Sequence, residues 1–130
     1  MPVVANHMSR DLLTAEPGER LGDAAKRMAA RGVGAVVVMD GARLAGILTE
    51  RDLMKAVAAG FTGDARVSEW MTRDPETIEP DESTDHAAAL MIHGGFRHLP
   101  VVEEGKAVVG ILSIRDLMRV ALQDSSPRGV

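Results

Sequence analysis

The sequence has no cysteine and few aromatic residues, with two Phe, one Trp and no Tyr. Without cysteine there is no disulfide framework, no thiolate nucleophile and no cysteine-based zinc site, and the composition fits a reducing compartment. So few aromatic side chains are not enough to build the stacking platforms on which proteins bind single-stranded bases. Small aliphatic side chains must therefore fill the core.

Long apolar runs and a strong excess of one charge are also missing. The Val-rich run at residues 35–39 stops at Asp40, far short of the roughly 18 to 20 apolar residues of a membrane helix. Residues 1–8 contain no basic region followed by an apolar one, so we expect no secretory signal and a cytoplasmic protein. The net charge is −4 and the basic residues are scattered, which argues against duplex nucleic acid as the main partner.

What the sequence does contain is an internal repeat. The 130 residues, 45% of them apolar and 26% charged, have the composition of a globular chain with a packed core. Shifting the sequence by 64 places residues 46–54 on residues 110–118 with only two differences. A shift of 63 aligns the upstream segments, setting Val4, Met8, Ser9, Arg10 and Asp11 on Val67, Met71, Thr72, Arg73 and Asp74. We therefore divide the chain into a first motif at 1–62, a second motif at 63–123 and a polar tail at 124–130.

Each half predicts the same order of helix, strand, strand and helix, which is a mixed α/β fold. Apolar residues recur at helical spacing before Gly32 and before Gly95, where a helix is expected to end. Two short β-branched runs joined by a turn with glycine then predict a hairpin. Thr49 and Ser113 are placed to begin the second helices. The expected strands are 36–38 and 44–48, then 99–102 and 107–112, with turns at 40–41 and 104–105, and a linker is expected at 60–66.

The repeated Gly-Ile-Leu-Thr/Ser-x-Arg-Asp-Leu block and the upstream Met-Ser/Thr-Arg-Asp segment resemble a tandem pair of CBS domains, the module named after cystathionine β-synthase. The resemblance covers residues 4–122. It implies two motifs related by a pseudo-twofold axis, with their sheets packed together and two clefts for AMP, ADP, ATP or S-adenosylmethionine. It also implies a regulatory binding module that is not an enzyme. With no second domain in the 130 residues, the module is expected to regulate an unknown protein in trans.

Two hydroxyl and carboxylate pairs, Thr49 with Asp52 and Ser113 with Asp116, allow two readings. A hydroxyl at the N-cap and a carboxylate three residues later form a capping box, although Asp is one methylene shorter than the Glu usually found there. The resemblance instead implies that each pair hydrogen-bonds a ribose. A carboxylate suits that role because its two oxygens accept from a cis-diol. The same side chains can serve both purposes, so the residues alone exclude neither reading.

The resemblance places further residues at the ligand. Thr14 and Thr77 would contact the nucleotide through a hydroxyl or nearby backbone, and their alternative is a surface threonine on a strand. Val33, Gly34 and Ala35 would line the adenine wall, or simply provide a small strand entry. The second repeat places other residues at the corresponding positions: Arg97 and His98 toward phosphates, Pro100 on the following strand, and Arg115, for which a solvated face or a salt bridge is the favoured alternative.

The two clefts are therefore expected to differ. The second repeat has Arg97 and His98 where the first has Gly34 and Ala35. Because a charge-assisted hydrogen bond to a phosphate contributes about 1.5 to 3 kcal/mol, we expect the nucleotide to bind first in the cleft of Ser113 and Asp116.

Catalytic and metal-binding patterns are not found. His86, His93 and His98 lack the spacing of a metal-ligand set. Ser113 lacks the G-x-S-x-G context of a nucleophile, and the glycine pairs precede strands where a phosphate loop needs a helix. We expect no catalytic cofactor and no metal, so the alternatives kept open are a ligand-free dimerisation module and an S-adenosylmethionine binder.

A homodimer is the expected assembly. Members of the family usually associate through their helices, and a two-fold interface requires only one self-complementary patch. The apolar residues expected on those helix faces are Met28, Leu53, Met91 and Leu117.

Overall fold

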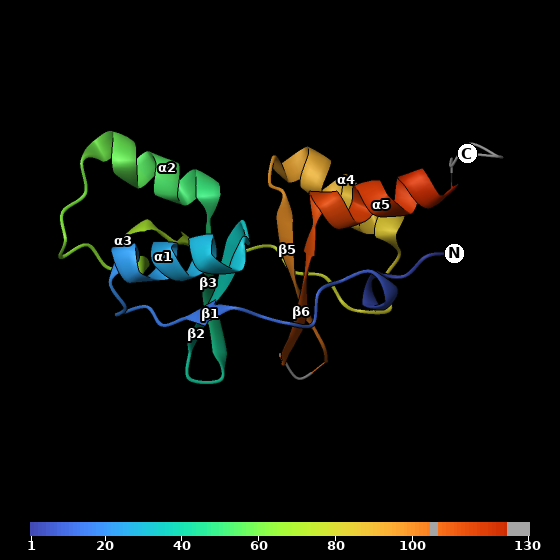
Figure 1. Cartoon of the computed structure of the whole chain (residues 1–130). Coiled ribbons are helices and arrows are strands. Elements are labelled where there is room, and N and C mark those ends of the chain that lie inside the picture. Colours follow the sequence, from blue (N-terminus) through green and yellow to red (C-terminus); the bar gives the residue numbers. More distant parts are fainter. Residues whose placement is uncertain (105–106, 125–130) are drawn as a thin grey trace. The chain divides into compact units, whose positions relative to one another are not determined.

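The computed structural model describes residues 1–104 and 107–124 of the chain (Figure 1). Its contacts separate two compact units. We call Leu12–Pro75 the first-repeat unit, and Met1–Asp11 together with Glu76–Val130 the second-repeat unit. No helix within the described ranges is long and apolar enough to cross a membrane.

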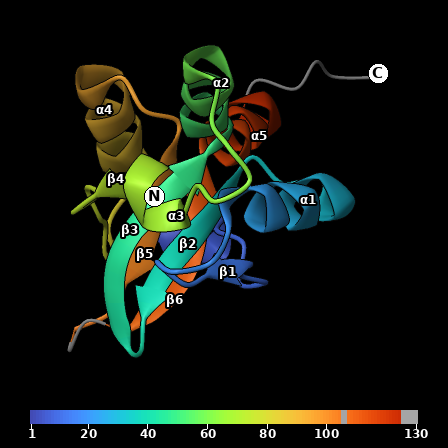
Figure 2. The ribbon, with the colours of Figure 1, turned by 90° about the vertical axis from the view of Figure 1, so that its left-hand side faces the viewer.

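The first-repeat unit is built on a sheet with the strand order β1-β2-β3-β4. β2 and β3 form the predicted antiparallel hairpin, and the short β1 pairs with β2 in parallel. Figure 2 shows α1 beside this hairpin and α2 continuing from the end of β3. The elements are β1 (Thr14–Ala15), α1 (Leu21–Arg31), β2 (Ala35–Asp40), β3 (Arg43–Thr49), α2 (Glu50–Ala59), α3 (Val67–Trp70) and β4 (Thr72–Arg73).

The second-repeat unit has the same plan with fewer strand residues. Its hairpin is antiparallel, and single bridges take the places of β1 and β4: Ile78 bridges Val101 in parallel, and Ser9 bridges Ile111 antiparallel. The mixed α/β fold and the repeated helix, strand, strand, helix order are thus confirmed. The elements are a 3-10 helix η1 (Val4–Asn6), α4 (Thr84–Gly94), β5 (His98–Val102), β6 (Val108–Ser113) and α5 (Ile114–Asp124).

The compact units divide the chain differently from the sequence repeats. Residues 1–11 begin the first sequence repeat but pack in the second-repeat unit, where the Ser9 N–H and carbonyl both bond to the backbone of Ile111 at 2.9 Å. Their counterparts in α3 and β4 follow α2 and stay with the first repeat, where β4 pairs with β3. Residues 60–66, expected as a linker between halves, lead instead into α3, and Ala65 and Val67 are buried in the core of the first-repeat unit.

The helix ends follow the sequence prediction closely. Gly32 and Gly95 adopt the left-handed conformation, with φ of 65° and 71°, at the ends of α1 and α4. α5 runs to Asp124, so the helix is longer than the tail boundary suggested. The turn expected at 104–105 lies partly, and the tail from 125 wholly, outside the described residues.

The apolar helix residues expected at a dimer interface are mostly core residues, which corrects that prediction. Met28 is 2% exposed and packs in the core of the first-repeat unit, whereas Met91 and Leu117, at 2% and 9%, pack in the core of the other unit. Leu53 is partly buried against the first core. Each helix directs its most apolar stripe toward its own hairpin, since a sheet of this size needs that cover to form a core.

Candidate functional site

The junction between β3 and α2 is fixed by the Thr49 and Asp52 pair. The Thr49 hydroxyl accepts from the Asp52 N–H at 3.2 Å, and Asp52 Oδ2 accepts from the Thr49 N–H at 2.9 Å and from its hydroxyl at 3.1 Å. This is a complete capping box. The shorter Asp side chain does reach back, because the extended backbone of Thr49 (φ −118°, ψ 168°) brings its N–H within range.

The junction between β6 and α5 repeats this geometry. Asp116 Oδ2 accepts from the Ser113 N–H at 2.8 Å and from its hydroxyl at 3.0 Å, and the hydroxyl accepts from the Asp116 N–H at 3.2 Å. The capping reading of both pairs is therefore confirmed. It does not exclude ribose binding, because a carboxylate has about four acceptor positions and the cap fills only part of them.

The second carboxylate oxygen distinguishes the two junctions. Asp52 Oδ1 accepts from the Thr72 hydroxyl of β4 at 3.3 Å, and Asp52 is buried at 6% exposure. Asp116 Oδ1 instead accepts from Arg119 Nη1 at 3.0 Å, with a mostly exposed guanidinium. Within the described ranges, Ser9, the repeat counterpart of Thr72, makes no hydrogen bond with Asp116.

Thr72 and Arg119 were missed by sequence reasoning, although the repeat contains a signal for each. Thr72 aligns with Ser9, so both repeats keep a hydroxyl at this position. Arg119 aligns with Lys55, so both keep a cation one turn after the motif Asp. Neither pattern identifies the partner of the side chain, since Thr72 reaches Asp52 only through the pairing of β4 with β3.

Other predicted site residues of the first repeat lie next to its junction. Ala35 is opposite Thr49 in the β2–β3 pairing, and the Gly34 carbonyl accepts from the Glu50 N–H at 3.0 Å. The second-repeat unit repeats this arrangement. His98 is opposite Ser113 in the β5–β6 pairing, and the Arg97 carbonyl accepts from the Ile114 N–H at 2.8 Å. In each unit the structure thus gathers the predicted strand-entry residues around the hydroxyl and carboxylate pair.

The remaining predicted residues, Thr14, Thr77 and Arg115, are exposed. Thr14 is exposed on β1, with its Cα partner at Val37 of β2. Thr77 is exposed directly before Ile78, whose N–H donates to the Pro100 carbonyl at 3.1 Å. Arg115 is exposed in the first turn of α5.

Val33 lines an apolar hollow of the first-repeat unit. Its volume is about 350 Å³, and its walls come mainly from α1 and α2. Val33 also packs against the core of that unit. The other lining residues are Ala25, Met28, Ala29, Gly32, Glu50 and Leu53.

The histidines are not gathered into a metal site in the described part of the chain, where no group of three candidate ligands is present. His86 lies on α4 with its Nε2 3.2 Å from Glu82 Oε1. His93 is near the C-terminal end of the same helix, and His98 is in β5.

Comparison with known proteins identifies the repeat. The sequence model of the CBS domain matches residues 4–59 and 67–123. An uncharacterised 17.7 kDa protein of Acidianus ambivalens is 39% identical over 108 residues, which are 82% of this chain and 65% of that protein. The chain therefore spans less than two thirds of this relative.

Two solved structures with bound ligands are similar over nearly their whole length. The CBS domain pair of protein MJ0100, in complex with 5′-methylthioadenosine and S-adenosyl-L-methionine, has a TM-score of 0.88 and 29% identity, over 95% of this chain and 98% of that one. CBSX2 in complex with AMP has a TM-score of 0.81 and 25% identity, over 96% of this chain and 99% of that one. Each of the ligands bound in these two structures contains an adenosine group.

Proposed function

Because the chain belongs to the CBS domain family, with one domain at 4–59 and another at 67–123, we propose that it is a regulatory module that binds an adenosine nucleotide and performs no catalysis. The observation that carries the proposal is the pair of matching junctions, each with a hydroxyl and a carboxylate at the start of a helix. The adenosine ligands of the MJ0100 pair and of CBSX2 support this ligand class.

The proposed chemistry assigns one role to each group. Asp52 and Asp116 accept from ribose hydroxyls with the acceptor positions that the helix cap leaves over. Arg97 and His98 supply donors for phosphates in the second repeat, and the guanidinium of Arg97 matches two phosphate oxygens at once. Gly34 and Ala35, being small, allow the adenine ring to approach the backbone of the first repeat.

Binding is tested by thermal unfolding with separate additions of AMP, ADP, ATP and S-adenosylmethionine. A ligand that binds only the native state at a hundred times its Kd stabilises by about 2.7 kcal/mol. For a chain of this size we expect Tm to rise by roughly 5 °C or more. Inosine monophosphate serves as the control for adenine recognition. If none of the four adenosine compounds changes Tm at millimolar concentration, the nucleotide-binding proposal fails.

The same experiment separates the alternatives. A ligand-free dimerisation module gives no shift with any compound, and an S-adenosylmethionine binder responds to that compound but to none of the nucleotides. Chromatography of the incubated nucleotides detects hydrolysis, which the proposal excludes. The proposal also includes regulation of another protein in trans and sensing of the cell's energy state, because a binding module needs a partner that responds to its bound ligand. It further includes a cytoplasmic location.

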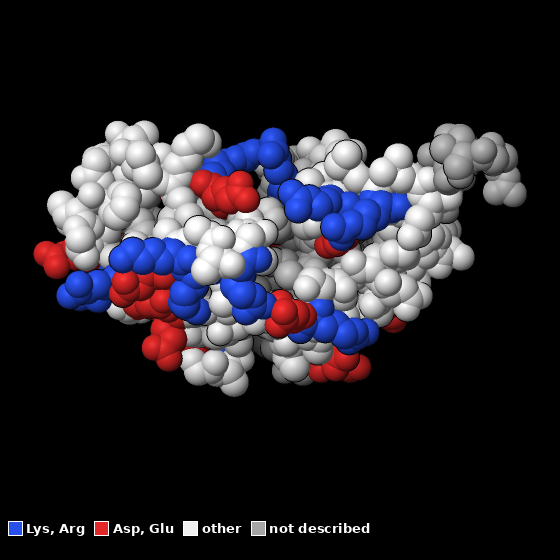
Figure 3. Space-filling view, viewed as in Figure 1, with Lys and Arg blue, Asp and Glu red and all other residues white. Residues whose placement is uncertain are grey.

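We also propose that the chain forms a homodimer through its exposed helix residues. Figure 3 shows mostly uncharged residues over α2, where Met54 and Val57 are exposed, and exposed apolar surface marks interaction sites. The family's usual association through helices supports a second copy as the occupant. The apolar side chains that remain more than half exposed on the helices are Met54, Val57, Ile92, Met118 and Leu122.

The homodimer is tested by placing charges on two of these helices. We expect wild-type protein to scatter light as a dimer at micromolar concentration, and the double variant Met54→Glu, Met118→Glu to scatter as a monomer, since buried unpaired carboxylates oppose association. Ala42→Glu, on the exposed β2–β3 turn, is the control and should remain dimeric. Wild-type protein that scatters as a monomer would refute the proposal.

A further inference from the structure

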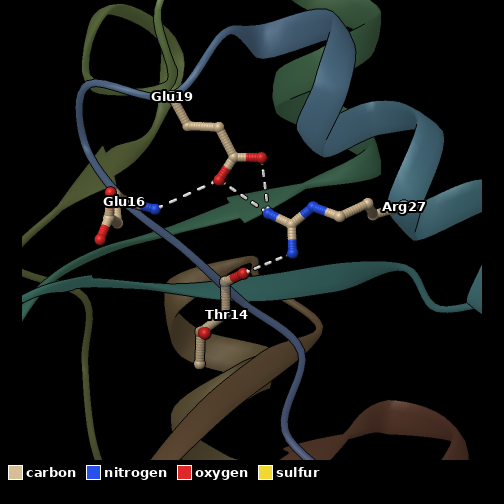
Figure 4. A network of polar contacts seen from close by, with 4 residues as sticks. All are labelled: Thr14, Glu16, Glu19 and Arg27. Atoms are coloured by element: carbon tan, nitrogen blue, oxygen red, sulfur yellow. Dashed lines mark hydrogen bonds and ion pairs between the residues drawn. The ribbon is translucent and has the colours of Figure 1, made fainter.

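One arginine ties the segment between β1 and α1 to the body of the first-repeat unit. Arg27 of α1 donates from Nη2 to both carboxylate oxygens of Glu19, at 2.7 and 2.6 Å, and from Nη1 to the Thr14 carbonyl at 2.9 Å (Figure 4). Glu19 Oε1 also accepts from the Glu16 N–H at 3.4 Å. A single guanidinium thus links a helix, a strand and the loop between them, and we call these four residues the Arg27 clamp.

Partial burial and the planar shape of the guanidinium keep the Arg27 clamp in one geometry. The Glu19 side chain is 22% exposed and that of Arg27 41%, so the pair is less screened by water than a fully exposed one. The planar fork of the guanidinium fixes direction as well as distance. Figure 4 shows the Thr14 hydroxyl pointing away from the guanidinium. Among the residues described, nothing hydrogen-bonds that hydroxyl, so the clamp fixes the backbone of Thr14 and leaves its side chain available.

The second repeat keeps the loop contact but lacks the arginine. Glu82, the counterpart of Glu19, accepts from the Glu79 N–H at 2.8 Å and lies 3.2 Å from His86 Nε2. Leu90 stands where the first repeat has Arg27. In the described residues no side chain donates to the carbonyl of Thr77, the counterpart of Thr14. The two candidate threonines are therefore held differently.

We propose that Arg27 is a positioning residue for ligand binding. It fixes the Thr14 backbone, so that the Thr14 hydroxyl and the adjacent peptide groups are already in place when an adenosine ligand binds. This inference rests on the proposed function, together with the contact between Thr14 and the ligand that the family resemblance implies. Fixing a contact segment before binding removes part of the ordering cost from association. The short β1 strand has only two residues in its ladder, so its own pairing provides little rigidity. Arg27 supplies the restraint that the strand lacks.

The test uses Arg27→Leu, which copies the residue that the second repeat carries at this position. Without ligand, we expect amide hydrogen exchange in residues 14–19 to become about tenfold faster, because the local opening free energy falls. With the tightest ligand of the thermal panel, calorimetry should give about tenfold weaker binding. Arg43→Leu is the matched control, since it removes another Arg–carboxylate pair of the same unit, with Asp40 on the β2–β3 turn. The control should change neither measurement.

A double-mutant cycle with Thr14→Ala separates positioning from a general loss of stability. If Arg27 acts through Thr14, Arg27→Leu weakens binding much less in the Thr14→Ala background than in wild type. Equal affinity of Arg27→Leu and wild type overturns the inference, as does unchanged exchange in residues 14–19 or full additivity in the cycle. If wild-type protein binds none of the panel, the proposed function fails and the ligand role of Arg27 fails with it. If the wild-type protein binds a ligand and Arg27→Leu binds it with the same affinity, only the inference about Arg27 is refuted.

Discussion

Asp116→Asn should weaken binding of an adenosine nucleotide by about 10- to 100-fold, because the carboxylate loses its charge-assisted hydrogen bonds to the ribose. Asp52→Asn should leave the tight site intact. In the second repeat Arg97 and His98 add phosphate donors, and Asp116 is partly exposed, with its Oδ1 bonded to the mostly exposed guanidinium of Arg119. Asp52 is buried and its Oδ1 is already bonded to Thr72. The second repeat is thus better equipped to bind first.

Asn is chosen over Ala because both Asp residues also cap helices. An Asn side chain keeps one acceptor oxygen for the N–H of Ser113 or Thr49, so the helix start is preserved while the charge is removed. Calorimetry measures affinity and stoichiometry, and thermal unfolding without ligand reports the remaining cap. Equal loss of affinity in the two variants, or a loss confined to Asp52→Asn, would contradict the predicted order. Equal destabilisation without any change in affinity would favour a purely structural role for both residues.

Alanine at Gly110 or Gly46 should destabilise the protein by about 1 to 3 kcal/mol through overpacking. A Cβ on Gly110 would lie 2.6 Å from Met8 Sδ and 2.8 Å from the Ser9 carbonyl oxygen. A Cβ on Gly46 would lie 2.6 Å from the Thr72 carbonyl oxygen. Met8 can rotate away, but the two backbone oxygens belong to segments that hydrogen-bond the same strands. Each substitution therefore pushes a paired segment off its hairpin.

Urea unfolding of the single variants measures this effect, with Gly18→Ala as the control. Gly18 has no atom within 4 Å of an added Cβ, and its φ is outside the left-handed region. The control should be neutral or slightly stabilising, because Ala restricts the unfolded chain. Wild-type stability in Gly110→Ala would mean that residues 8–9 do not pack on β6 as described. An unstable Gly18→Ala would remove the meaning of the comparison, so its stability is measured first.

The local structure of this chain was predictable because the same local sequence patterns occur in both repeats. Periodic apolar residues, the glycines at helix ends and the hairpin turns are short-range signals, and each recurred in both repeats. The capping role of Thr49 and Ser113 followed from the same local chemistry. The reach of Asp52 and Asp116 was underestimated, because it depends on the extended backbone conformation at the cap, which a residue pattern does not contain.

The partners of side chains distant in sequence were not predictable. Thr72 and Asp52 are twenty residues apart, and their hydrogen bond exists because β4 pairs with β3. Arg27 of α1 reaches the Thr14 carbonyl of β1 although thirteen residues separate them in sequence. Helical periodicity placed Met28 and Met91 on the apolar faces of their helices. It could not decide whether those faces pack in the core or in an interface between two copies of the chain.

The sequence alone determined the duplication, the α/β class, the order of elements in each repeat and the two hydroxyl and carboxylate pairs, because all of these rest on patterns local to the chain. Only the tertiary structure decided that residues 1–11 pack with the second repeat while residues 67–73 pack with the first. Gly46 and Gly110 mark where these segments approach a strand too closely for any Cβ. Such a choice depends on which free strand edge a segment pairs with, and equivalent edges in two similar repeats offer nearly the same local chemistry.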